Sequence, residues 1–119
     1  MPLFVTTPAV LALTTCPNQP VAEALAAALV EQSLVACVTL LPGATSFYRW
    51  QGVVQRDSEV LLLLKTQQSA VAALQAYLLQ HHPYELPEFI VFPITSGLPA
   101  YLQWLEQAVT PSPSDHESE

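Results

Sequence analysis

Positive charge is scarce in this sequence. Three Lys and Arg residues stand against ten Asp and Glu residues, which gives a formal net charge of −7. A protein that binds nucleic acid needs a basic surface to neutralise phosphates. We therefore expect no nucleic-acid partner, and the acidic balance favours cations as ligands.

Cysteine and glycine are also scarce. Two cysteines are too few for a disulfide framework, which favours a reducing, cytoplasmic compartment. The three glycines form no phosphate-binding loop or dinucleotide fingerprint, and the chain has neither a nucleophile elbow nor an HExxH helix. The sequence therefore predicts no enzyme and no obligatory cofactor.

A continuous apolar run of about 20 residues, the length that crosses a bilayer, is missing as well. The N-terminal segment MPLFVTTPAVLALTTC has no Lys or Arg before its apolar run, and Pro8 interrupts it, so it makes a poor signal peptide. Apolar residues nevertheless make up 51% of the chain and charged residues only 11%. We expect no membrane contact, and an apolar surface that meets another subunit.

The length of 119 residues fits one domain. We place this domain at residues 1–109. The remaining residues, TPSPSDHESE, are mostly Pro, Ser and acidic. Such a composition predicts a disordered acidic tail over residues 110–119.

Two strand–helix–strand units follow one another along the domain. Periodicity and breakers predict strands at 9–15, 34–41, 44–54, 59–66 and 88–94, with a bend at Pro42-Gly43 and a turn at 55–58. Helices are predicted at 21–32 with Asn18 as N-cap, at 69–82 ending before Pro83, and at 99–109 with Leu102, Leu105 and Trp104 against the fold. This order predicts an α+β, ferredoxin-like split βαβ fold with the helices on one face of an antiparallel sheet. A second copy of the chain would cover the open sheet face.

Three side chains are candidate metal ligands. His81 and His82 stand at a helix end, where imidazoles can be exposed, and Cys16 follows the first strand. Thiolate and imidazole suit copper or zinc. The alternative interpretation is that the histidines cap the last helical carbonyls and Cys16 is an isolated thiol.

A second candidate site is a pocket with aromatic walls. Tyr48 and Trp50 point to one side of their strand because side chains alternate. With Lys65, Tyr84 and Glu88 they make up an expected binding pocket of aromatic walls and a few polar groups. The alternative is that the aromatic rings only pack.

Four segments together carry a family resemblance: LVACVTLLPGATSFYRWQG, EVLLLLKT, HHPYELPEFIVFPITSG and YLQWL. Over residues 9–109 the chain resembles the CutA divalent-cation tolerance family. The resemblance implies a ferredoxin-like protomer in a PII-like homotrimer and a role in tolerance of, or response to, divalent metals, copper in particular. The alternative is a trimeric PII-like interaction or small-molecule sensing module with no intrinsic metal role.

The resemblance also bears on the three candidate ligands. In some bacterial members of the family, a cysteine near the end of the first strand and a His-His pair bind copper. His81 and His82 match that pair, whereas the cysteine position of the family corresponds to Thr14 in this chain. Cys16 stands two residues later, which displaces a strand side chain by about 7 Å.

Overall fold

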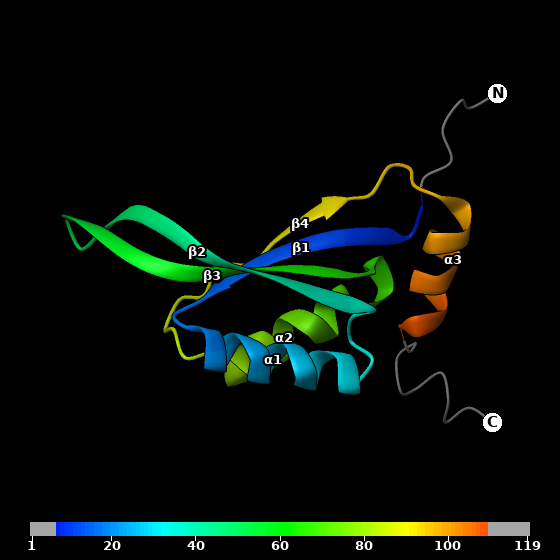
Figure 1. The fold of residues 1–119 in the computed structure, drawn as a ribbon, viewed down its shortest axis with the longest axis horizontal. Helices are drawn as coiled ribbons and strands as arrows, with labels where there is room; N and C mark the ends of the chain where they lie inside the picture. Colours follow the sequence, from blue (N-terminus) through cyan, green and yellow to red (C-terminus); the bar gives the residue numbers. More distant parts are fainter. Residues whose placement is uncertain (1–6, 110–119) are drawn as a thin grey trace.

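The computed structural model describes residues 7–109, so the predicted acidic tail lies outside the described residues. The elements are β1 (Ala9–Cys16), α1 (Gln19–Glu31), β2 (Cys37–Trp50), β3 (Val53–Gln67), the 3₁₀ turn η1 (Gln68–Ala70), α2 (Val71–His81), β4 (Ile90–Pro93) and α3 (Pro99–Ala108). Figure 1 shows α1 and α2 on one side of the sheet and α3 at the end opposite the tip of the β2–β3 hairpin.

The sheet has the strand order β2-β3-β1-β4, and every neighbouring pair is antiparallel. This arrangement confirms the predicted α+β, ferredoxin-like fold with its helices on one sheet face. The core lies between the sheet and α1 and α2, where Leu62 and Leu64 of β3 meet Leu29, Leu74 and Leu78. The N-cap prediction also holds, since the Asn18 side chain accepts a hydrogen bond of 3.0 Å from the Val21 N–H.

The hairpin differs from the prediction. The chain turns at Gln51 and Gly52, both with positive φ (52° and 82°), and not at residues 55–58, which continue β3 as paired residues. A two-residue turn with two positive φ angles suits the right-handed twist of the strands. Pro42-Gly43 forms a bulge inside one continuous strand, because the register shifts between Leu41 and Ala44.

The sheet face away from the helices is largely apolar. Alternation and register place Leu11, Leu13, Leu41, Leu61, Leu63, Ile90 and Phe92 on it together. Leu41, Ile90 and Phe92 are each 46% exposed.

Trp104 was predicted to press on the fold together with Leu105, but only Leu105 of α3 is buried and Trp104 is exposed. Within residues 7–109, no helix is long and apolar enough to cross a membrane.

Candidate functional site: a buried histidine and an acidic aromatic pocket

His82 is buried at the end of α2 beside the last residues of β1. Its Nε2 lies 2.7 Å from the Thr15 carbonyl oxygen, and its Nδ1 lies 3.1 Å from the Tyr84 backbone nitrogen. Because a carbonyl only accepts and an N–H only donates, the proton is on Nε2 and the lone pair of Nδ1 is engaged. The Nε2 bond ties His82 to β1, and the Nδ1 bond fixes the start of the 82–89 loop. Metal ligation by His82 would require breaking one of these bonds.

Cys16 is the neighbour that the sequence proposed for His82, and the structure brings the two together. Their Sγ and Nε2 atoms lie 4.0 Å apart. The Cys16 side chain is fully buried, and burial, followed by the charge of Glu59, raises its pKa to about 11. The thiol is therefore protonated near neutral pH, although the thiolate is the form that binds metals.

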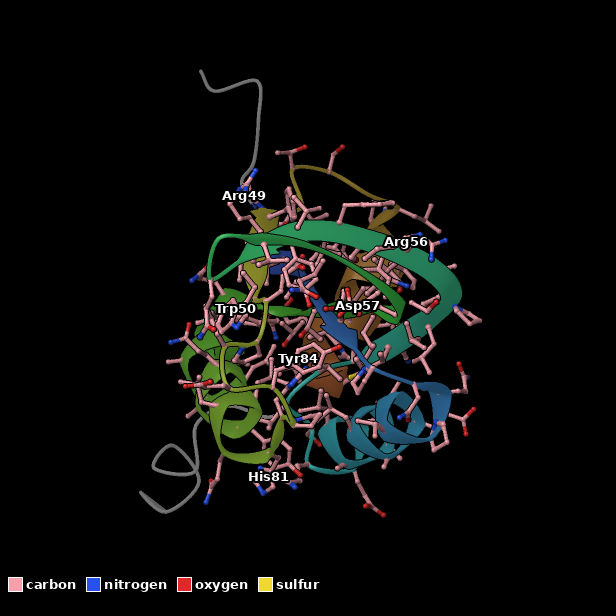
Figure 2. All side chains as sticks on the ribbon, turned by 90° about the vertical axis from the view of Figure 1, so that its left-hand side faces the viewer. Arg49, Trp50, Arg56, Asp57, His81 and Tyr84 are labelled. Carbon is pink, nitrogen blue, oxygen red and sulfur yellow. The ribbon has the colours of Figure 1, made fainter. Side chains whose placement is uncertain are left out.

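His81 is separated from this pair, because its side chain is exposed. Its ring stacks on Tyr77 with a centroid distance of 3.9 Å, and its Nδ1 donates to the Tyr77 carbonyl oxygen at 3.0 Å. Figure 2 places His81 at the helical side of the molecule, away from Trp50, Asp57 and Tyr84. Sequence reasoning treated both histidines as exposed, which is correct for His81 and wrong for His82.

In residues 7–109, no three His, Cys, Asp or Glu side chains gather closely enough to hold a metal ion. Cys16 and His82 meet in the interior, whereas His81 faces outward. The structure brings Cys16 and His82 together without His81, and ligation of one metal ion by all three residues stays a prediction.

A pocket of about 530 Å³ lies between the hairpin and the 82–89 loop. Four of the five residues predicted for it line its wall: Tyr48, Trp50, Tyr84 and Glu88. In Figure 2, Trp50, Asp57 and Tyr84 lie inside the curve of the hairpin, whereas Arg49 and Arg56 lie on its outer side. The cause is strand alternation, which turns Trp50 and Asp57 inward and the two arginines outward.

Lys65, the fifth predicted residue, does not line the pocket. It lies six residues beyond Glu59 on β3, which is about 20 Å along a strand. There it pairs with Cys37 and Leu11, and its Nζ donates to Thr39 Oγ1 at 3.2 Å. The pocket therefore lacks the cation that the sequence assigned to it.

Two tyrosine hydroxyls in the pocket donate to carboxylates. Tyr84 donates to Glu59 at 2.8 Å, and Tyr48 donates to Asp57 across the hairpin. The bond to Asp57 raises the pKa of Tyr48, and burial together with the bond to Glu59 raises that of Tyr84. Both hydroxyls are therefore protonated donors that fix their rings in place.

Sequence reasoning missed Asp57, Glu59 and Glu85 as pocket residues. The misplaced turn explains the first two. With the turn at Gln51-Gly52, Tyr48 pairs with Gln55, and Asp57 and Glu59 follow on the same face. The Gln51-Gly52 pair was the signal in the sequence for the true position of the turn, because glycine readily adopts a positive φ.

The fold and site define a ferredoxin-like α+β protein with an acidic, aromatic pocket beside its hairpin. Residues 10–108 match the family described as CutA1 divalent ion tolerance protein. The chain belongs to this family.

Several relatives show how far the likeness extends. Identity is 49% over 104 residues to Protein CutA of Mus musculus, covering 87% of this chain and 58% of that protein, so the chain spans little more than half of the mouse protein. Identity is 45% over 101 residues to the divalent-cation tolerance protein CutA of Yersinia pestis, covering 85% of each. The crystal structure of CutA from Xylella fastidiosa superposes with a TM-score of 0.85 at 43% identity, covering 87% of this chain and 100% of that one.

Proposed function

We propose that the chain acts in divalent-cation tolerance as a homotrimer that binds the cation, copper or zinc, instead of transforming a substrate. The observation that carries this proposal is the exposed imidazole of His81. Its Nδ1 proton is held by the Tyr77 carbonyl oxygen, which leaves Nε2 as the ring atom that can bind a metal. Neutral imidazole suits both copper and zinc.

The relatives and the charge balance support a cation as the ligand. The Yersinia pestis protein is named for divalent-cation tolerance and matches 85% of this chain at 45% identity. The net charge of −7 attracts cations to the molecule as a whole. Because His81 is a single ligand, a tight site needs further donors from water or from a second copy of the chain.

The open face of the sheet supports an oligomer. Leu41, Ile90 and Phe92 lie on it, each 46% exposed. An apolar surface of this kind is stabilised when another subunit removes it from water. A homotrimer is the assembly that the family resemblance implies.

Binding is favoured over catalysis by the state of the reactive groups. The Cys16 thiol, with its pKa raised to about 11, is a poor nucleophile near neutral pH. The hydroxyls of Tyr48 and Tyr84 donate to carboxylates and have raised pKa values. None of these groups is prepared for nucleophilic attack or for abstracting a proton.

Calorimetric titration of the full chain with Cu(II) and Zn(II) tests the proposal. We expect binding that weakens at least tenfold in His81→Ala and is unchanged in Cys16→Ser. A chain that ends at Val109 controls for His116 and the acidic residues of the tail, and we expect it to bind like the full chain. Absence of binding, or binding lost only with the tail, would contradict the proposal.

A further inference from the structure

The pocket between the hairpin and the 82–89 loop has the size of a small-molecule site. Its volume of about 530 Å³ falls within the range of ligand pockets, about 300–1,000 Å³. β2 contributes Tyr48 and Trp50, β3 contributes Asp57 and Glu59, and the loop contributes Tyr84 and Glu88. The walls therefore come from segments far apart in the chain and are held in place by the fold.

The charges around the pocket select the sign of its ligand. Asp57, Glu59, Glu85 and Glu88 line it, and none of the lining residues in the described part of the chain is Lys, Arg or His. Glu59 is only 9% exposed, and its carboxylate accepts the Tyr84 hydroxyl. These four carboxylates repel a phosphate or carboxylate ligand and attract a cation.

The aromatic rings indicate an organic cation. Trp50 and Tyr48 both line the pocket. Their side chains are 41% and 43% exposed. Faces of Trp and Tyr attract ammonium groups and also pack against apolar carbon. The pocket thus offers negative charge for the head of a ligand and ring surface for its body.

A bare metal ion fits this arrangement poorly. Metal ions need several donor atoms converging on one point, and no three carboxylate, thiol or imidazole side chains do so within residues 7–109. Asp57 and Glu59 each already accept a tyrosine hydroxyl. A ligand larger than one ion can instead contact carboxylates and rings spread around the cavity.

We propose that this pocket binds a small protonated amine with an apolar body. The ammonium group lies among the carboxylates, and the apolar body packs against Trp50 and Tyr48. This site shares no residue with the proposed metal ligand His81, which Figure 2 places away from the pocket. The amine proposal can therefore fail while metal binding stands, and the reverse is also true.

Three ligands of one shape and different charge test the proposal on the full-length protein: 2-phenylethylamine, 2-phenylethanol and phenylacetate. We expect calorimetry to show binding of the amine, at least tenfold weaker binding of the alcohol, and no binding of the carboxylate. Amine binding should also weaken as salt is raised, because screening reduces the attraction. Equal affinity for amine and alcohol, or no binding of the amine, would overturn the proposal.

Two variants with matched controls locate the binding. Glu88→Gln removes one charge from the pocket wall, and Glu23→Gln removes one from the surface of α1, where Glu23 is exposed. Trp50→Leu removes the pocket ring, and Trp104→Leu removes the exposed ring of α3. Far-ultraviolet circular dichroism establishes that each variant is folded. We expect the two pocket variants to weaken amine binding at least fivefold and the two controls to leave it unchanged. Equal losses in pocket variants and controls, or displacement of the amine by equimolar Zn(II), would refute an amine site here.

Discussion

Hydrogen bonding separates two histidines that are neighbours in sequence. His82 is 8% exposed, and both of its ring nitrogens are bonded to backbone groups. His81 has one bonded nitrogen and an exposed ring. Sequence alone could not separate them, because the difference depends on where β1 and the 82–89 loop pass. The pairing of Cys16 with His82 was predicted from chemistry, but its burial was not.

This difference in hydrogen bonding predicts different losses of stability when each histidine is replaced by alanine. His82→Ala leaves the Thr15 carbonyl and the Tyr84 N–H without their partner, and a buried unsatisfied group costs about 1–3 kcal/mol. His81→Ala should change the free energy of unfolding by less than about 1 kcal/mol, since its bond is exposed. Urea denaturation at one fixed protein concentration measures both. Similar losses in the two variants would contradict the structural role of His82.

Thr14 presents the opposite case, a buried hydroxyl with no hydrogen-bond partner within the described residues. Thr14→Val keeps the shape and removes the unsatisfied oxygen, so we expect the free energy of unfolding to stay the same or rise by about 1 kcal/mol. Thr66→Val is the matched control, because the Thr66 hydroxyl donates to the Leu34 carbonyl oxygen at 2.7 Å. It should lose about 1–2 kcal/mol. Destabilisation of Thr14→Val equal to that of the control would show that Thr14 has a partner.

The Cys16 thiol predicts a loss of stability in alkali. Its pKa is raised from 9.0 to about 11 on folding, so the folded state holds the proton more tightly than the unfolded state. The stabilisation is complete below pH 9 and is lost as pH rises from about 9 to about 11. Unfolding free energy measured across this range should fall more steeply in the wild type than in Cys16→Ala. Identical slopes would contradict a raised pKa.

At the scale of elements, the turn at Gln51 and Gly52 sets the register of the β2–β3 hairpin. This register determines which side chains of the hairpin line the pocket. Gly52 has φ of 82°, and a Cβ built there would meet nothing within 4 Å. The cost of Gly52→Ala is therefore conformational, about 1–2 kcal/mol. Gln51→Asn should not destabilise, because asparagine tolerates positive φ. Urea denaturation compares the two, and a harmless Gly52→Ala would contradict the observed turn.

The helices and the order of strands could be predicted from the sequence, because Asn18, Pro83 and Pro99 mark helix ends and the apolar periods are clear. The hairpin turn could not be placed by polarity. Residues 55–58 are polar because this part of β3 is exposed, although it is paired with β2. That error moved Asp57 and Glu59 out of the expected pocket. Lys65 was included because sequence alone did not give its distance from Tyr48 and Trp50.

At the scale of the whole molecule, the open face of the sheet makes a trimer testable. Phe92 stands on this face opposite Leu11, while Leu79 of α2 is exposed to 63% on the helical side. Phe92→Asp places a charge where we expect a second copy to pack, and burial of an unpaired charge is costly. Leu79→Asp adds the same charge at a site outside that face.

Sedimentation equilibrium measures the assembly of all three proteins. We expect the wild type and Leu79→Asp to sediment as trimers and Phe92→Asp to dissociate at micromolar concentration. Chelation by EDTA should leave the wild-type trimer intact, because apolar contacts bury the interface whether or not metal is bound. A monomeric wild type would leave the apolar face without a partner copy, and dissociation by EDTA would make the metal part of the interface. The first result would contradict the oligomer that the exposed side chains of Leu41, Ile90 and Phe92 support. The second would contradict an interface held by apolar contacts alone.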